Sequence, residues 1–409
     1  MNIRALDYKN IVLTMTLVIV HVFFSIFNIL RLTHAGREDS YAFTIFCLIF
    51  LTLSLFIVFF EWFKHKVKFN VTQYLFLVFI PLFISVIFFI ENAENPVALQ
   101  LYQYYLSFGV VSSYIGIYYS KNKKELTKSL KYWVLLIWLL TIGSFIELYI
   151  FLFTAPPDAF QIMHGQRLSY TLAIAYSLNL LFLLCRNKIK TFSICNSKKY
   201  TYVSVVMLLS KIVCIFISGG RGGFVVIVFS TFVIFYYAVK KKFIKAKILI
   251  GIIIVFVSIF FALPVLLSNE VIRRGYERVF SYITPAGIDA TQASGRDIVW
   301  RNTLYGINER LIFGHGIFGQ IDYLGGTPHN FFLEVLLSGG LIYLFIILLI
   351  LLFFIYKFIF VIKNDINNSL LLPFISVVFV SLMVSGTYLT AGMFWFLGAY
   401  VFSYEKIIK

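Results

Sequence analysis

Residues 331–356 read FFLEVLLSGGLIYLFIILLILLFFIY, and Glu334 is the only charged side chain among these 26 residues. An α-helix of this length rises about 39 Å, which exceeds the hydrocarbon core of a bilayer, about 30 Å thick. A soluble helix would carry charged residues along its water-facing side. The segment therefore predicts a membrane-spanning helix.

Further apolar runs of span length occur throughout the chain. They lie near residues 11–30, 41–60, 71–90, 97–119, 132–153, 169–185, 201–217, 222–239 and 248–267. The charge-free stretch 370–404 is too long for one span, and a division at Gly386 gives two. The chain is 60% hydrophobic and 13% charged, whereas soluble domains are about 25% charged. We therefore expect an all-α integral membrane protein of about twelve helices, with residues 11–30 retained as its first helix.

The basic residues lie in clusters between the apolar runs and give a net charge of +17. Counting the runs in order places clusters such as residues 64–68 and 240–247 on the same side of the membrane. The positive-inside rule makes that side the cytoplasm. We therefore expect both termini in the cytoplasm, membrane lipid as the main surroundings and no nucleic-acid partner.

Residues 268–330 form the one long hydrophilic stretch, and the helix count places it on the outer side. It separates nine expected helices in residues 1–267 from three in residues 331–409. Its six basic and six acidic residues balance, so it is not a polybasic lipid-binding tail. Residues 294–310 within it read as an amphipathic helix.

Three sites near the outer face carry residues suited to an anionic ligand. The first is the turn S-G-G-R-G-G at residues 218–223. Gly220 and Gly222 can leave backbone N–H groups accessible to an anion, and Arg221 adds a bidentate donor. The structural alternative is a glycine hairpin with an arginine at a helix end.

The second site is the segment S-G-R-D-I-V-W-R at residues 294–301. A cation in the first turn of a helix opposes the macrodipole. The presence of Arg296 there therefore indicates a role other than stabilising the helix. Trp300 and Arg301 add an aromatic ring and a second cation. The alternative is a surface arginine paired with an acidic neighbour.

The third site, T-P-H-N at residues 327–330, directly precedes the helix that begins at 331. His329 can transfer protons near neutral pH, and Glu334, one helical turn further on, is a candidate to orient it. The alternative is a polar N-terminal cap formed by Asn330. Lys211, inside the run 201–217, is a further candidate because ionisable groups in a membrane are costly. It could instead snorkel or pair internally.

Two other chemistries find little support in the sequence. The stretch G-H-G-I-F-G at residues 314–319 matches a dinucleotide-binding motif by letters, but no strand–helix context surrounds it, and we interpret it as a turn. No cluster of His and Cys has metal-ligand spacing. We expect neither a metal nor an organic cofactor.

Taken in order, these segments resemble the O-antigen ligase and O-antigen polymerase superfamily, of the Wzy and WaaL type. The resemblance rests on five segments, at residues 218–223, 294–300, 313–319, 328–330 and 339–340. It covers roughly residues 200–345, whereas the first half shares only its multi-span character. The turn S-G-G-R-G-G is one glycine longer than the usual S-R-G of that family.

The resemblance implies a glycosyltransferase of the bacterial inner membrane whose active site faces the periplasm. Its donor would be a glycan on undecaprenyl pyrophosphate, its acceptor a second glycan, and its partners a chain-length regulator and a flippase. Such a reaction needs cations for the pyrophosphate, which Arg221 and Arg296 can supply, and a base, which His329 can supply. The expected substrate-binding residues are Gly220, Gly222, Trp300, Arg301, Asn330, Glu334 and Lys211.

Three functions fit these expectations to different degrees. A polymerase of polysaccharide repeat units is the preferred reading. A ligase, or a transferase that acts on protein, would use the same donor. A transporter or flippase is the third reading. Transporters usually show two related halves with substrate groups at mid-bilayer, whereas here the polar residues gather at one face and the long loop divides the expected helices nine to three.

Overall fold

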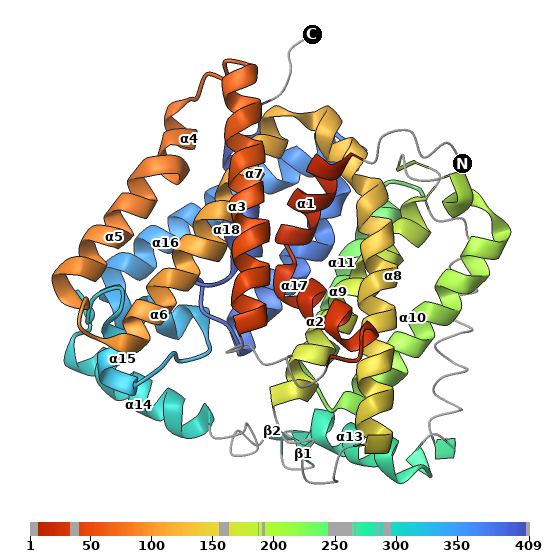
Figure 1. Ribbon diagram of the computed structural model, residues 1–409. Coiled ribbons are helices and arrows are strands. Elements are labelled where there is room, and N and C mark those ends of the chain that lie inside the picture. The colour runs from red at the N-terminus through yellow and green to blue at the C-terminus, as the bar shows by residue number, and fades with distance from the viewer. Residues whose placement is uncertain are drawn as a thin grey trace.

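The computed structural model describes residues 7–32, 41–154, 163–186, 188–189, 193–243, 264–265, 267–281, 283–284, 287–288 and 296–405. These residues form helices and one two-stranded hairpin (Figure 1). The helices of the first half are α1 (Tyr8–Thr16), α2 (Ile19–Ile29), α3 (Tyr41–Lys64), α4 (Val71–Tyr74), η2 (Leu75–Phe79), α5 (Ile80–Glu91), α6 (Pro96–Tyr104), η3 (Tyr105–Val110), α7 (Val111–Lys121), α8 (Lys123–Thr154) and α9 (Met163–Cys185).

The second half continues with η5 (Ser193–Asn196), α10 (Lys198–Ser218), α11 (Arg221–Lys240), α13 (Glu270–Phe280), β1 (Ile283–Thr284), β2 (Gly287–Ile288), α14 (Arg296–Glu309), α15 (Gly319–Leu324), α16 (Phe331–Asn364), η7 (Ile366–Leu370), α17 (Leu371–Val384) and α18 (Gly392–Ser403). β1 pairs with β2 in antiparallel fashion, with Ile283 opposite Ile288. The all-helical class expected from the sequence is confirmed.

Eight helices in the described part of the chain are long and apolar enough to cross a membrane, or nine if one bent pair counts as a span. They are Tyr41–Lys64, Val71–Glu91, Lys123–Ile150, Gly165–Cys185, Lys198–Ser218, Arg221–Lys240, Phe331–Asn364 and Ile366–Val384. This count is lower than the expected twelve. The expected span at 248–267 lies almost entirely outside the described residues.

The first apolar run is broken where one straight helix was expected. α1 and α2 meet at an angle of 102°, and Val18 between them has a non-helical backbone. Thr16 at the end of α1 hydrogen-bonds its own helix through Val12 O, at 2.9 Å, and α3 through Ser54 Oγ, at 2.7 Å. Such local side-chain bonds compete with the helical pattern, and apolar composition does not reveal them.

The expected span at 97–119 also departs from a regular helix. It consists of α6, a π-helical segment η3 and α7. α7 buries Ser112, Ser113 and Ser120 and packs against α18. A Cβ on Gly116 would stand 2.6 Å from the carbonyl oxygen of Phe396, so this glycine permits the close approach of the two helices.

The expected division of residues 370–404 at Gly386 is confirmed. α17 ends at Val384 and α18 begins at Gly392. α18 has 12 residues and rises only about 18 Å, so it is shorter than a bilayer core. The connection between the two helices therefore lies within the bundle, where it can contribute residues to a site.

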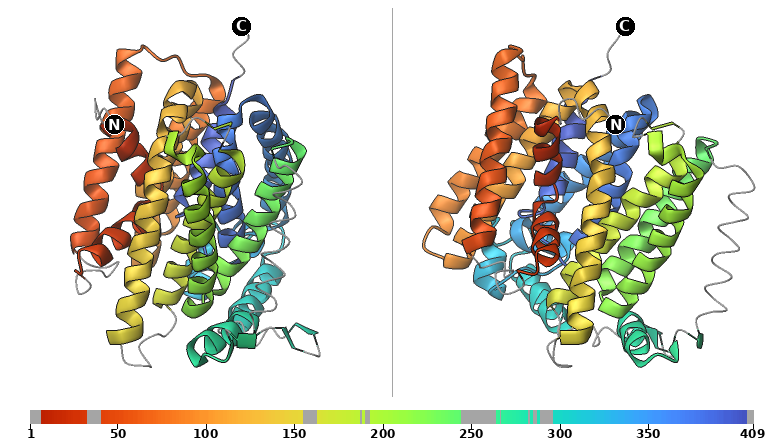
Figure 2. Two further views of the ribbon diagram at one scale, coloured as in Figure 1. Left: turned by 90° about the vertical axis from the view of Figure 1, so that its right-hand side faces the viewer. Right: turned by 45° about the vertical axis from the view of Figure 1, so that its right-hand side comes forward.

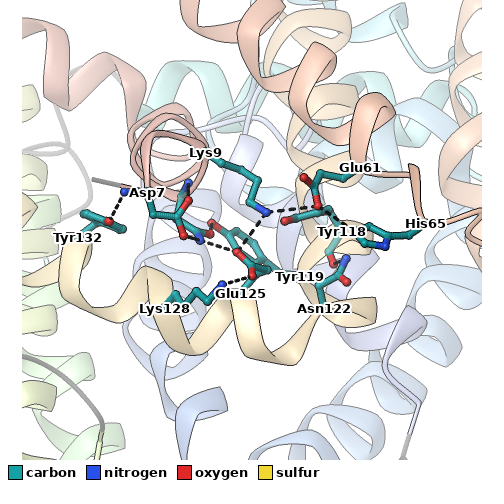
Figure 3. A network of polar contacts seen from close by, with 11 residues as sticks. Asp7, Lys9, Glu61, His65, Tyr118, Tyr119, Asn122, Glu125, Lys128 and Tyr132 are labelled. Carbon is teal, nitrogen blue, oxygen red and sulfur yellow. Dashed lines mark hydrogen bonds and ion pairs between the residues drawn. The ribbon is translucent and has the colours of Figure 1, made fainter. Parts of the chain in front are cut away.

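The first and last described segments meet at one end of the bundle. Lys9 of α1 lies 3.3 Å from both Glu61 and Glu125, as Figure 3 shows. Glu405, just after α18, lies 3.5 Å from Lys121 at the end of α7. α13, α14 and the β-hairpin lie at the opposite end (Figures 1 and 2). This arrangement agrees with both termini lying on the same side of a membrane.

Candidate functional site

The glycine turn at residues 218–223 joins α10 to α11 and packs tightly against α9. Gly219 ends α10 in the left-handed conformation, with φ of +62°. A Cβ on Gly220 would overlap the side chain of Ser169, and one on Gly222 would overlap the phenol of Tyr170. Helix contact therefore requires glycine at both positions, beyond the anion-binding role expected from the sequence.

Arg221 begins α11 and meets a second arginine. Its Nε donates to the carbonyl oxygen of Arg278 at 2.8 Å. The Arg278 side chain lies over Gly219, where a Cβ would stand 3.0 Å from its Cδ. Burial and the charge of Arg221 lower the pKa of Arg278. Two guanidinium groups held this close raise the local affinity for an anion.

Sequence reasoning missed Arg278. It lies on α13, which is fixed to the end of α10 because Gly275 packs on the carbonyl oxygen of Phe216, where a Cβ would overlap it. Phe280 adds an edge-on contact with Phe224, with ring centroids 5.3 Å apart. A helical reading of the basic segment 270–280, with its central glycine, would have been the available signal.

α14 lies within the helix expected at residues 294–310, with Arg296 in its first turn, and buries Thr303, Gly306 and Ile307. The indole Nε1 of Trp300 donates to the carbonyl oxygen of Pro328 at 2.9 Å, so Trp300 ties this helix to the segment that carries His329. Arg301, the next residue of α14, is exposed. Residues 294–295, which precede α14, lie outside the described residues.

His329 has φ of +54°, a left-handed conformation that is uncommon outside glycine and recurs at functional sites. Its Nδ1 lies 3.1 Å from the carbonyl oxygen of Ser385. A carbonyl can only accept, so Nδ1 carries the proton and Nε2 of the neutral ring keeps a free lone pair. Burial, opposed by this hydrogen bond and reinforced by the charge of Arg296, lowers the pKa of His329 below its ordinary value.

Asn330 caps α16. Its Oδ1 accepts from the backbone N–H groups of Phe332 and Leu333, at 3.1 and 3.2 Å, which confirms the capping alternative. Its Nδ2 donates to the carbonyl oxygen of Met383 at 3.3 Å. His329 therefore holds the residue after α17, and Asn330 holds the last turn of α17. These bonds leave little side-chain capacity on Asn330 for a ligand.

The turn and the histidine belong to one connected structure. Tyr170, which packs on Gly222, hydrogen-bonds Ser385 Oγ at 2.6 Å, and the carbonyl of Ser385 holds His329. Arg296 is close enough to affect the pKa of that histidine. The arginine turn, the histidine and the start of α14 therefore share one framework built from α9, α11, α14 and the 385–391 connection.

Residues 203–348 match the family model Wzy_C, which is described as O-Antigen ligase. This part of the chain is similar to the O-antigen ligase family. The match confirms the resemblance inferred from the sequence motifs, and it implies glycosyl transfer of the O-antigen ligase or polymerase type. It runs from α10 into α16 and includes Arg221, Arg278, Arg296 and His329. No curated protein and no solved structure matches the chain.

Glu334, within the matched residues 203–348, has different partners from those expected. It is fully buried and accepts from Thr387 Oγ1, and Gln320 Nε2 lies 3.4 Å from the same carboxylate oxygen. Gln320 in turn accepts from Ser338 Oγ at 3.0 Å. Among the described residues, Glu334 thus joins α15, α16 and the 385–391 connection rather than orienting His329. A polar residue near a helix end can form hydrogen bonds with any of several neighbours, and the spacing of residues in the sequence does not show which of them it bonds.

Lys211 of the same segment is fully buried on the face of α10 that includes Ile215 and Ser218. Its Nζ has no hydrogen-bond partner within the described part of the chain. Ser218 lies seven residues further along, about 10 Å along the helix axis. Lys211 therefore lies inside the bundle, about two helical turns along α10 from the glycine turn at residues 218–223.

The glycines at 314–319 and 339–340, within the matched residues, pack together. α16 is interrupted at Gly340, which has φ of +62° and ψ of −159°. The segment before α15 fills the break, because Leu341 N donates to Leu311 O at 2.9 Å and His315 N donates to Leu337 O at 2.8 Å. A Cβ on Gly314 would stand 2.5 Å from Gly339 N. These glycines serve close backbone approach, in agreement with the reading of 314–319 as a turn.

Within the residues that the structure describes, no group of three or more His, Cys, Asp or Glu side chains is placed to hold a metal ion. Arg221, Arg278 and Arg296 are cationic and His329 is neutral, so these four side chains favour an anionic ligand.

Proposed function

We propose that the protein is a polymerase that joins undecaprenyl-pyrophosphate-linked oligosaccharide repeat units at the periplasmic face of the bacterial inner membrane. The observation that carries this proposal is the chain of contacts from the Arg221 turn through Tyr170 and Ser385 to His329. It puts cations suited to a pyrophosphate and a proton acceptor suited to a hydroxyl on one rigid framework.

The arginines would act on the donor. As the bond between the anomeric carbon and the pyrophosphate oxygen breaks, its electron pair leaves with the lipid pyrophosphate, and negative charge grows there. Arg221, with Arg278 beside it, can hold the two phosphates, and guanidinium groups pair with phosphate oxygens in a bidentate manner. Arg296 supplies a further cation near His329. Fixed cations lower the barrier because they need no reorganisation during the reaction.

His329 would act on the acceptor. The acceptor hydroxyl oxygen forms the new bond to the anomeric carbon, and its proton moves to Nε2 of His329. The hydrogen bond at Nδ1 keeps that lone pair available, and the lowered pKa keeps the ring neutral near pH 7. A base with these properties typically contributes 10²–10⁴-fold to the rate.

The test uses purified protein in nanodiscs supplied with lipid-linked repeat units, with product length read by gel electrophoresis. Arg221→Ala, Arg296→Ala and His329→Ala should abolish long chains, and loss of an arginine should cost about 3–4 kcal/mol of barrier. Arg274→Ala is the matched control, because Arg274 is an exposed arginine of α13 paired with Glu270. Normal chain lengths in the three variants would refute this assignment of the site.

A ligase is the second candidate, and the description of the matching family favours it. It would use the same donor and the same residues, with lipid A-core as the acceptor. Gene deletion separates the two. Loss of a polymerase should leave a single repeat unit on the cell surface, whereas loss of a ligase should leave bare core. A chain-length regulator and a flippase are the protein partners that the polymerase would need.

A further inference from the structure

A groove of about 470 Å³ lies at the end of the bundle opposite the proposed active site. It is formed where the end of α3 meets α4, η2 and α7. Its lining includes Phe59, Trp62, Lys66, Phe69, Tyr74 and Tyr114. Phe63 and Val78 also line the groove and are exposed, as is Phe60 beside it on α3. Because such apolar faces belong in hydrocarbon, the groove opens toward lipid.

The buried indole of Trp62 lacks an acceptor. Trp62 is only 6% exposed, and its Nε1 has no hydrogen-bond partner within the described part of the chain. Its ring is held by an edge-on contact with Phe69, with centroids 4.9 Å apart. A buried N–H group without a hydrogen-bond partner costs free energy. A ligand in the groove with an acceptor oxygen near Trp62 Nε1 would remove that cost.

Lys66 occupies a backbone position that favours glycine. α3 ends in a Schellman arrangement, with Val67 N donating to Trp62 O and Lys66 N donating to Phe63 O. The residue at this position takes the left-handed conformation, and Lys66 has φ of +46°. A lysine kept where glycine would be less strained indicates that its charge is needed at the mouth of the groove.

The cations at this mouth are available to a ligand. Lys64, Lys66 and Lys68 are exposed, and the described residues include no ion pair to any of the three. The nearest carboxylate along the chain, Glu61, is already engaged by Lys9 at 3.3 Å and His65 at 3.5 Å (Figure 3). The groove therefore presents net positive charge beside an apolar lining.

We propose that this groove is a binding site for an anionic phospholipid. One acyl chain fills the apolar lining between Phe59, Tyr74 and Tyr114, an ester carbonyl accepts from Trp62 Nε1, and the phosphate pairs with Lys66. Basic pockets between membrane helices bind anionic head groups in this manner. A water-soluble anion would leave the aromatic lining unfilled, and a zwitterionic lipid would gain less from the lysines.

The experiment is native mass spectrometry of the full chain in mild detergent with added phosphatidylglycerol or phosphatidylcholine of identical acyl chains. The wild type should bind phosphatidylglycerol about fivefold more tightly. Lys66→Gly, which suits the left-handed backbone and removes the charge, should lose this preference. Trp62→Phe should weaken both lipids by removing the donor. Lys357→Ala, at a half-buried lysine of α16 outside the groove, should match the wild type.

Equal binding of the two lipids by the wild type, or an unchanged preference in Lys66→Gly, would overturn the proposal. Added undecaprenyl phosphate provides a second discrimination. If it displaces phosphatidylglycerol at equimolar concentration, the groove belongs to a polyprenyl phosphate and the phospholipid assignment fails. Because polymer formation is not the readout, these outcomes are independent of the proposed glycosyl transfer.

Discussion

His329 combines three features that rarely coincide in one side chain. Its backbone is left-handed, its Nδ1 is held by a main-chain carbonyl, and a nearby arginine influences its pKa. The first two set the direction and the tautomer of the ring. The third links the proposed base to the proposed donor site, so a change at Arg296 should be measurable at His329.

Replacement of Arg296 by alanine should change the pH dependence of activity as well as its size. The charge of Arg296 disfavours the protonated imidazole, so its loss raises the pKa of His329. Activity that requires the neutral ring appears as pH rises through this pKa. The acid limb of the pH–rate profile should therefore move to higher pH in Arg296→Ala and stay in place in Arg296→Lys. Coincident acid limbs in Arg296→Ala and the wild type would contradict the coupling.

Gly220→Ala should destabilise the protein because the new Cβ would overlap Ser169. Overpacking of this kind costs about 1–3 kcal/mol, and the melting temperature in detergent should fall. The double variant with Ser169→Gly should recover most of that loss. Gly326→Ala is the control, because a Cβ there would meet no atom within 4 Å. Equal melting temperatures for Gly220→Ala and Gly326→Ala would show that the α9 contact is not tight.

Among the elements, α14 and α16 depend on each other. Trp300 of α14 bonds the residue just before His329, and the break in α16 at Gly340 is filled by residues that follow α14. A broken membrane helix normally exposes unsatisfied backbone groups. Here the segment 311–316 satisfies several of them, so the loop and the helix form one folded unit.

The Trp300→Phe variant distinguishes two roles of this side chain, stacking on a sugar and the hydrogen bond that ties α14 to Pro328. Sugar stacking would survive, because a phenyl ring remains, whereas the hydrogen bond to Pro328 would be lost. We expect a loss of stability of about 0.5–1.5 kcal/mol and a decrease in kcat, measured by thermal unfolding and by chain elongation. Full stability and activity in Trp300→Phe, together with inactivity of Trp300→Leu, would instead favour stacking as the role of the ring.

For the whole molecule, the two ends of the bundle differ in chemistry. One end carries the ion pairs of Lys9 with Glu61 and Glu125 (Figure 3). The exposed lysines Lys64, Lys66 and Lys68 lie at the same end. The other end carries α13, α14 and the proposed active site (Figure 2). From the positive-inside rule we predict that the first end faces the cytoplasm.

Cysteine labelling in intact cells tests this orientation. A membrane-impermeant maleimide should label Tyr305→Cys, at a side chain 61% exposed on α14, and should leave Lys68→Cys unlabelled until the inner membrane is opened. The native cysteines should contribute little background, since Cys47, Cys185 and Cys195 are buried and Cys214 is half-buried. The reverse labelling pattern would place the proposed active site in the cytoplasm and exclude a periplasmic donor.

The sequence by itself determined the helical class, most of the span positions, the break near Gly386 and a helix that contains Arg296 in its first turn. It also offered the cap at Asn330 as one of two alternatives. Each of these follows from local composition or from residues within a few positions of one another, which hydropathy and capping preferences express directly. The ordered motifs also predicted the family.

Only the tertiary structure decided which distant residues meet. In the tertiary structure the first apolar run is bent, and Arg278 lies beside Arg221. Glu334 accepts a hydrogen bond from Thr387, and Tyr170 is connected through Ser385 to His329. These partners are separated by up to 215 positions in the chain, and the contacts depend on how closely helices pack at particular glycines. No local pattern of residues specifies how closely two helices pack, because the distance between them depends on the side chains of both helices.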